Sequence, residues 1–233
     1  MYVIQQLKES KHSIKAVFFD DGGVLNDNRL RGPEYRKLIG RFMAERLGES
    51  AERWALANEK VFPHLWSDLQ NQITDFSNHR EYQREFELLW IHRMCSLVSI
   101  TVPPDDIATS VARSALVYAG QHAQTEIKGA ANSVWKLFNA NYLLYAASGT
   151  PSWELNVIFS RMGIRQVFSG LYGPDLVDCV KYGTRFYDQI FKEAGILPEE
   201  CLVIESSKKC CACLLYTSPS PRDQRGSRMP SSA

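Results

Sequence analysis

The chain has 233 residues, of which 45% are hydrophobic and 23% charged, and its formal net charge is +1. This composition suits one globular domain with a modest insertion, and it excludes disordered and fibrous proteins. No block of basic residues of the kind that follows a phosphate backbone is present, so we expect no nucleic-acid partner. Small soluble molecules are the expected partners.

The N-terminal residues 1–15 are polar, and no apolar run approaches the roughly 20 residues that cross a bilayer. We therefore expect a cytoplasmic protein with no membrane partner, and the sequence leaves its oligomeric state open. The six cysteines lack the spacing of metal ligands and are expected to be reduced thiols.

The first half of the chain changes from a strand pattern to a helical one. The apolar run at residues 14–19 stops at Asp20-Asp21-Gly22-Gly23, which predicts a buried strand that ends at a glycine-rich turn. From Pro33 to residue 47 the apolar side chains follow a helical period, so we predict a helix that begins at this proline. Further helices are predicted by the same period over residues 50–61, 77–97 and 105–115.

After residue 118, strands and helices alternate in the way that a parallel α/β sheet requires. The fold class is therefore α/β, with a core in residues 1–29 and 119–212 and an all-helical insertion after the first strand in residues 30–118. The predicted strands cover residues 142–147, 166–171 and 201–205, and the predicted helices cover residues 126–138, 152–162 and 183–194.

Four candidate reactive groups lie at or just after the carboxyl ends of predicted strands: Asp20, Ser148, Lys181 and Glu205. Open α/β sheets bind ligands at this edge. A carboxylate nucleophile, a hydroxyl group with a backbone amide, a lysine and acidic metal ligands make a sufficient set for phosphoryl transfer.

Four segments, in order, resemble the motifs of the haloacid dehalogenase superfamily. Residues 18–27, with a second aspartate seven positions after Asp20, are similar to its first motif. Residues 143–151 resemble the second motif, Lys181 ahead of Phe186-Tyr187 resembles the third, and residues 201–207 resemble the fourth. The resemblance implies a Rossmann-like parallel sheet with an all-helical cap that closes over the active site.

The resemblance also implies roles for individual residues. Asp20 would attack phosphorus and form an aspartyl-phosphate, while Ser148 and the Gly149 amide would hold phosphate oxygens. Lys181 would stabilise the nucleophile and the phosphate. The chain is thus expected to be a hydrolase, a phosphatase acting on a small phosphate ester.

Magnesium is the expected cofactor, because superfamily phosphatases use it to bridge nucleophile and substrate. By resemblance its ligands would be Asp20, the Gly22 carbonyl and Glu205. The chain departs from the phosphatase pattern at two positions. Gly22 stands where an aspartate usually serves as general acid and base, a loss that typically costs about 10²- to 10⁴-fold in rate. Some superfamily members with a similar first motif also carry glycine there, so three alternatives stay open: Asp21 replaces the acid, a water replaces it, or the leaving group needs little protonation. Ser206 stands where the fourth motif usually has an aspartate, which removes one negative charge from the cation site.

Two alternatives therefore stay open. The first is carbon–halogen hydrolysis through the same Asp20, which needs neither a metal nor the second aspartate. The second is a phosphate-binding descendant that has lost turnover, because Gly22 and Ser206 both depart from the catalytic pattern.

Other polar and aromatic residues are expected to be structural. Asp27 is expected to be a turn or helix-cap residue, and Arg29 and Arg31 are expected to be solvated. The cap core is expected to contain Trp54, Trp66 and Trp90.

The pattern of the chain breaks off after residue 212, where turn residues replace both helical and strand periods. Residues 213–223 and 227–233 read as translated sequencing-library adapters, so we expect residues 213–233 to be a non-native tail on an incomplete core. Without this tail the net charge is −1, since 24 basic and 25 acidic residues remain. We expect the loss of a following strand and helix to leave the 233-residue chain insoluble or inactive.

Overall fold

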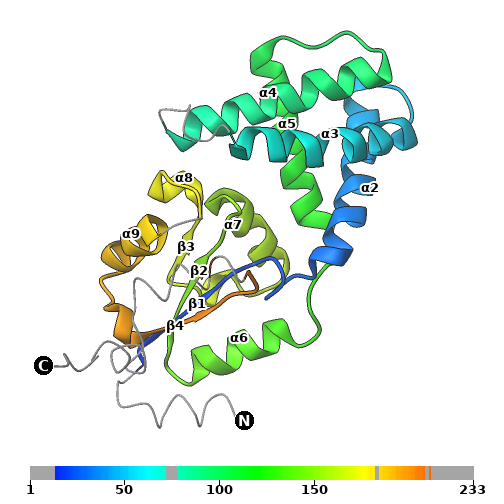
Figure 1. Cartoon of the computed structure of the whole chain (residues 1–233). Helices are drawn as coiled ribbons and strands as arrows, with labels where there is room; N and C mark the ends of the chain where they lie inside the picture. Colours follow the sequence, from blue (N-terminus) through cyan, green and yellow to red (C-terminus); the bar gives the residue numbers. More distant parts are fainter. Residues whose placement is uncertain (1–13, 72–77, 182–183, 208–209, 211–233) are drawn as a thin grey trace, which may run out of the picture.

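The computed structural model describes residues 14–71, 78–181, 184–207 and 210. The predicted tail at 213–233 lies outside these residues. Within them, a parallel four-stranded sheet and its helices form a core, and four long helices form a cap beside it (Figure 1). The strand order is β3-β2-β1-β4, with β1 (Ala16–Phe19), β2 (Leu143–Ala147), β3 (Gly170–Tyr172) and β4 (Cys201–Ile204).

The central strand β1 is buried on both faces, which explains its uninterrupted apolar sequence. It pairs with β2 on one side and with β4 on the other, so that Phe19 lies opposite Ala146 and Ile204. Val17 and Phe19 belong to the core on one face of the sheet, and Ala16 and Phe18 to the core on the other.

Core helices cover both faces of this sheet. Side chains from α6 (Ala130–Asn139) and α7 (Ser152–Arg161) pack on one face, and those of α9 (Thr184–Ala194) pack on the other. The remaining short elements are η2 (Arg165–Val167), α8 (Pro174–Val177) and η3 (Pro198–Glu200).

The strand predicted over residues 166–171 is wrong at its start. Residues 165–167 form the single 3₁₀ turn η2, and β3 begins only at Gly170. Val167 and Phe168 are buried in the core in both descriptions, so their apolar character alone does not distinguish a turn from a strand. The amides of Val167 and Phe168 donate hydrogen bonds to the carbonyls of Ile164 and Arg165, so these backbone groups are paired within the turn.

The cap has a hydrophobic core of its own, which contains the fully buried Trp54 and Trp90. None of the helices in the described part of the chain is both long and apolar enough to cross a membrane. The cap helices are α2 (Asn28–Leu47), α3 (Ala51–Asn71), α4 (His79–Val98) and α5 (Asp105–His122).

Helix α2 begins earlier than the sequence predicts. The Asp27 side chain accepts a hydrogen bond from the Arg29 amide at 2.9 Å and caps the helix, which confirms the structural role expected of this aspartate. Pro33 consequently lies inside the helix. An N-cap aspartate therefore sets the start of α2, and the proline is accommodated in its second turn.

The two chain segments that connect the cap to the core run side by side. The Asp27 amide donates to the Thr125 carbonyl at 2.7 Å, and the Ile127 amide donates to the Leu25 carbonyl at 2.9 Å. Asn26 and Glu126 form an antiparallel bridge between these bonds. The cap is thus an insertion whose entry and exit are hydrogen-bonded to each other.

Candidate active site

Asp20 lies directly beyond the carboxyl end of β1. Its amide donates to the Ile204 carbonyl at 2.9 Å, which continues the ladder between β1 and β4 and fixes the backbone. Its carboxylate accepts a hydrogen bond from the Asp21 amide at 2.8 Å, and the side chain is 11% exposed. The carboxylate is therefore oriented by the strand end while it still reaches the solvent-accessible cleft described below.

Lys181 joins two carboxylates. Its Nζ lies 2.7 Å from Oδ1 of Asp20 and 2.6 Å from Oε2 of Glu205. Glu205 also accepts hydrogen bonds from the Tyr187 hydroxyl at 3.1 Å and from the amides of Ser206 and Ser207 at 2.9 and 2.8 Å. A carboxylate has about four lone-pair positions, so Glu205 has its full set of partners and holds Lys181 in place.

The two carboxylates differ in proton affinity. Burial raises the pKa of Asp20 to about 6, against the lowering effect of the Lys181 charge and of hydrogen bonds from Lys181 and Ser148. Burial acts on Glu205 in the same direction, but the hydrogen bond and charge of Lys181 outweigh it and keep the Glu205 pKa below its usual value. Asp20 is thus ionised at neutral pH, as a nucleophile must be.

Ser148 follows β2 and faces the same edge of the sheet. Its amide donates to the Tyr172 carbonyl at 3.0 Å, and its hydroxyl oxygen accepts from the Thr150 amide at 3.2 Å. The loop through Gly149 leads into α7, whose N-terminus carries a partial positive charge that favours bound anions. Asp20, Ser148, Gly149 and Lys181 therefore lie on one cavity wall, as their positions after strands predict.

Asn28 is a site residue that the sequence did not reveal. A Cβ atom at Gly22 would come within 2.6 Å of the Asn28 side-chain oxygen, so Asn28 fills the space that a residue-22 side chain would take. An amide cannot serve as a general acid at neutral pH. No spacing rule connects Gly22 with Asn28, because their contact depends on where α2 begins.

Comparison with known proteins supports the fold. No family model and no curated protein matches the sequence. A defluorinating L-2-haloacid dehalogenase is similar in structure, with a TM-score of 0.64 and 15% identity over 94% of this chain and 85% of that one. The chain has the haloacid dehalogenase fold with a helical cap.

Besides this dehalogenase, solved structures described as a HAD-hydrolase and as a phosphatase share the fold. A HAD-hydrolase from Bacillus subtilis bound to magnesium has a TM-score of 0.58 and 14% identity, over 84% of this chain and 82% of that one. A predicted phosphoglycolate phosphatase from Haemophilus somnus has a TM-score of 0.57 and 12% identity, over 89% and 84% of the two chains. These identities show a shared fold, and the reaction has to be argued from the site.

The magnesium site expected from the sequence does not fit this version of the haloacid dehalogenase fold. The lone pairs of Glu205 are already used by four donors, and the Gly22 carbonyl accepts a hydrogen bond from the Ser206 hydroxyl at 2.8 Å. Asp20 is the remaining anionic ligand, and it shares the Lys181 ammonium group with Glu205. Within the described residues, no group of three or more His, Cys, Asp or Glu side chains is placed to hold a metal ion.

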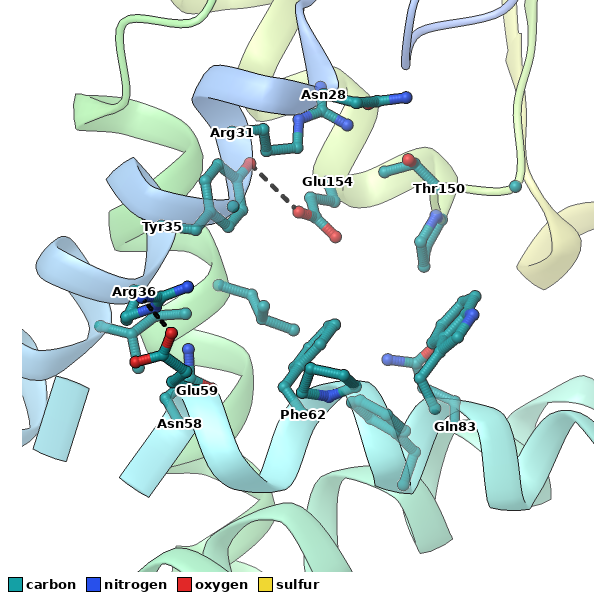
Figure 2. Close-up of a pocket in the computed structure, with 18 of the residues that line it drawn as sticks. Asn28, Arg31, Tyr35, Arg36, Asn58, Glu59, Phe62, Gln83, Thr150 and Glu154 are labelled. Carbon is teal, nitrogen blue, oxygen red and sulfur yellow. Dashed lines mark hydrogen bonds and ion pairs between the residues drawn. The ribbon is translucent and has the colours of Figure 1, made fainter. Parts of the chain in front are cut away.

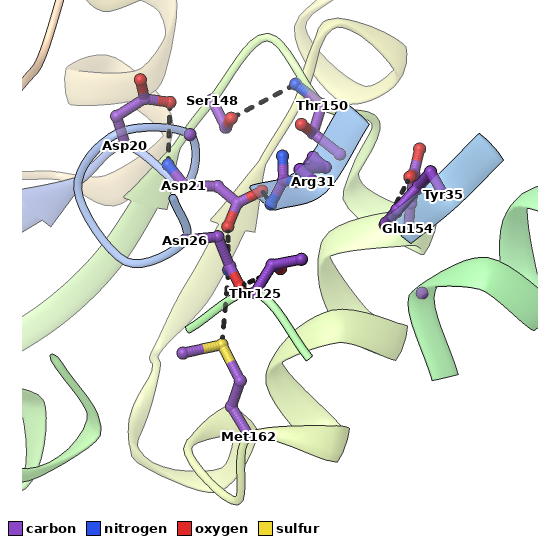
Figure 3. A network of polar contacts seen from close by, with 12 residues as sticks. Asp20, Asp21, Asn26, Arg31, Tyr35, Thr125, Ser148, Thr150, Glu154 and Met162 are labelled. Atoms are coloured by element: carbon purple, nitrogen blue, oxygen red, sulfur yellow. Dashed lines mark hydrogen bonds and ion pairs between the residues drawn. The ribbon is translucent and has the colours of Figure 1, made fainter. Parts of the chain in front are cut away.

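Arg31 is not solvated, contrary to the prediction. It pairs with the fully buried Asp21 at 2.5 Å, and Asp21 also accepts from the Asn26 amide group at 2.6 Å (Figure 3). Arg29, in contrast, is exposed and pairs with Asp27 at 2.7 Å. The residue after Asp20 is thereby tied to the first turn of the cap.

A cleft between core and cap leads to Asp20. Its inner part has a volume of about 490 Å³ and is lined by Asp20, Ser148, Lys181 and Glu205. Trp66, which was predicted to lie in the cap core, is 39% exposed and lines this cleft instead. A helical period cannot separate a cap residue that faces the core domain from one that faces its own helices.

Proposed function

We propose that the protein is a hydrolase in which Asp20 forms a covalent ester with an organic substrate, and that carbon–halogen bonds are its target. The single observation that carries this proposal is the contact of Lys181 with both Asp20 and Glu205 at 2.7 and 2.6 Å. Two carboxylates and one ammonium group give the inner site a formal charge of −1. Such a site favours attack on an uncharged carbon atom over attack on a phosphate dianion.

The departures from the phosphatase pattern agree with this chemistry. A halide ion leaves without protonation, so the acid missing at Gly22 is not needed. The reaction also needs no metal, so neither the saturated Glu205 nor Ser206 impairs it.

The proposed reaction has two steps. A carboxylate oxygen of Asp20 attacks the carbon that bears the halogen, and the halide departs with the bonding electron pair. Water then attacks the side-chain carbonyl carbon of the ester, which releases the alcohol and a proton and restores Asp20. Lys181 holds the Asp20 carboxylate in place, and Ser148, in the loop that leads into α7, binds an acidic group of the substrate.

Phosphate ester hydrolysis is the second candidate, because the loop from Ser148 to Thr150 at the start of α7 also suits a phosphate group. The two reactions differ in the atom that water attacks. In one turnover with isotopically labelled water, the ester mechanism places the label in the Asp20 carboxylate, whereas hydrolysis of an aspartyl-phosphate at phosphorus places it in the released phosphate.

The first prediction tests the proposed function directly. Soluble protein is incubated with 2-chloropropionate and 2-bromo-3-phenylpropionate in the presence of a metal chelator, and halide release is measured. We expect halide release with chelator present. Asp20→Asn should abolish it, because an amide is a poor nucleophile, while Asp188→Asn on the exposed side of α9 should leave it unchanged.

Hydrolysis of p-nitrophenyl phosphate that requires added magnesium, without halide release from either haloacid, would contradict the proposal and favour the phosphatase. Mass spectrometry of the Asp20 peptide after one turnover in labelled water provides the second readout.

A further inference from the structure

We infer that the outer part of the cleft binds a flat aromatic group, so that the preferred substrates carry an aryl group and are not two- or three-carbon acids. The inference rests on the proposed function for the reaction at Asp20. It adds the class of substrate that the cleft binds.

The cleft is continuous and larger than a small acid needs. Beyond the inner part lies a cavity of about 720 Å³ between core and cap, and both parts share wall residues that include Asn28, Phe62 and Thr150. Cavities of about 300–1,000 Å³ typically hold drug-sized ligands. A three-carbon acid bound at Asp20 would leave the outer part filled with water.

The cap side of the outer part is an aromatic wall. The rings of Phe62 and Trp66 on α3 are parallel, with centroids 6.4 Å apart, and Phe86 on α4 meets both edge-on at 5.4 and 6.0 Å. Trp90 supports Phe62 from the buried side at 5.9 Å. These contacts fix the rings in place, so a ligand ring can stack on them without the cost of ordering loose side chains.

The rest of the lining is polar, but its charges are paired. Arg36 lies 2.6 Å from Glu59, which is on α3 like Phe62, and Arg31 is paired with Asp21. Figure 2 shows Glu154 and Thr150 across the cavity from Phe62. Burial raises the pKa of Glu154 to about 7, so this carboxyl group is largely uncharged below neutral pH. The outer cavity therefore suits an uncharged apolar group with few polar substituents.

Binding to the Asp20→Asn protein tests the inference without requiring turnover. The probes are matched pairs that differ by one phenyl ring: 3-phenyllactate against lactate, and phenyl phosphate against methyl phosphate. Titration calorimetry should show that the phenyl member of the pair that binds is favoured by about tenfold or more. Equal affinities within each pair, or no binding of any of the four probes, would overturn the inference.

Variants of the wall locate the effect. Trp66→Ala and Phe62→Leu should each reduce the preference for the phenyl member about three- to tenfold, because stacking is lost; comparing the two members of a pair cancels effects on the inner part that both share. Phe138→Ala, at an exposed position on α6, is the matched control and should leave the preference unchanged. An unchanged preference in both wall variants, with thermal melts that show them folded, would also overturn the inference.

The outcome is separable from that of the proposed function. A phenyl preference in binding with no halide release would reject carbon–halogen hydrolysis and keep the aryl-binding cleft. Halide release at equal rates from 2-chloropropionate and 2-bromo-3-phenylpropionate, after correction for the leaving halide, would keep the reaction and reject the cleft inference.

Discussion

Lys181 sets the charge state of the active site through two contacts. Because it stabilises both neighbouring carboxylates, Glu205 keeps a low pKa, and Asp20 is the partner whose pKa burial raises to about 6. Asp20 is therefore the one of these two carboxylates whose charge changes nearer to neutral pH. Its titration enters the pH profile of the proposed reaction.

We predict that kcat/KM is level above about pH 6.5 and falls about tenfold for each pH unit below about 6, because only the ionised Asp20 attacks. The measurement is halide release between about pH 4.5 and 8, with circular dichroism to show that the protein stays folded. Asp188→Asn should give the same profile. A rate that does not change between about pH 5 and 7 would show that Asp20 is not the titrating nucleophile.

The sequence alone predicts that the candidate reactive residues lie close together. Asp20 and Ser148 directly follow β1 and β2, and the carboxyl ends of parallel strands share one edge, so the sequence predicts that they meet. Lys181 lines the same cavity, but it follows α8 and not a strand. The partners supplied by the cap could not be predicted in this way. Asn28 and Arg31 reach the site because α2 begins at Asn28, which depends on the cap at Asp27 and on the packing of the helix.

At the scale of elements, the close crossing of α2 and α3 organises the cap. A Cβ atom at Gly40 would lie 2.4 Å from the Ala51 carbonyl oxygen and 2.9 Å from the Ala55 Cβ, so the two helices touch backbone to backbone at this point. Gly32 lies in the same helix, and a Cβ atom there would meet nothing within 4 Å. Close packing therefore requires glycine at residue 40, whereas no contact requires it at residue 32.

We predict that Gly40→Ala lowers the free energy of unfolding by about 1–3 kcal/mol through overpacking. Gly32→Ala is the matched control and should raise the free energy of unfolding by up to about 1 kcal/mol, because alanine favours helix over glycine. Urea denaturation of both variants measures the difference. A Gly40→Ala protein as stable as the Gly32→Ala protein would show that the helices can separate at little cost.

The helical period predicted which cap segments are helices, but it did not predict their ends. The helix predicted over residues 50–61 continues as α3 to Asn71 and includes Pro63, and α2 likewise includes Pro33. Pro33 is predicted to mark the start of a helix, yet packing against neighbouring helices stabilises helices that continue through both prolines. Tertiary contacts of this kind are invisible to a local pattern.

At the scale of the whole molecule, a buried polar network joins core and cap. Glu154 on α7 accepts a hydrogen bond from the Tyr35 hydroxyl on α2 at 3.3 Å, and the charges of Arg31 and Asp21 act on it from the same region. Burial is the main cause of the raised Glu154 pKa. The contact between the two parts of the protein therefore contains a group that changes charge near neutral pH.

We predict that this group makes stability depend on pH. The folded-state pKa of about 7 lies above the ordinary value of 4.5, so the contribution is complete below about pH 4.5 and is lost as pH rises through about 7. At about 1.4 kcal/mol per unit, the loss approaches about 3 kcal/mol. Glu154→Gln should remove this dependence, which urea denaturation at about pH 5 and about pH 8 measures.

Glu199→Gln, at an exposed position, is the control and should keep the pH dependence of the parent protein. If the parent protein and Glu154→Gln change in parallel between the two pH values, another group is responsible.

The paired connections at residues 25–27 and 125–127 also bear on how the cap can be exchanged during evolution. Because the cap leaves the core and returns at hydrogen-bonded neighbours, a helical insertion of another length can be joined at these two points. β1 would keep both of its partner strands, and Asp20 would keep its place. Recombination at this junction can therefore exchange the aromatic wall for another surface while the reactive carboxylate is inherited unchanged.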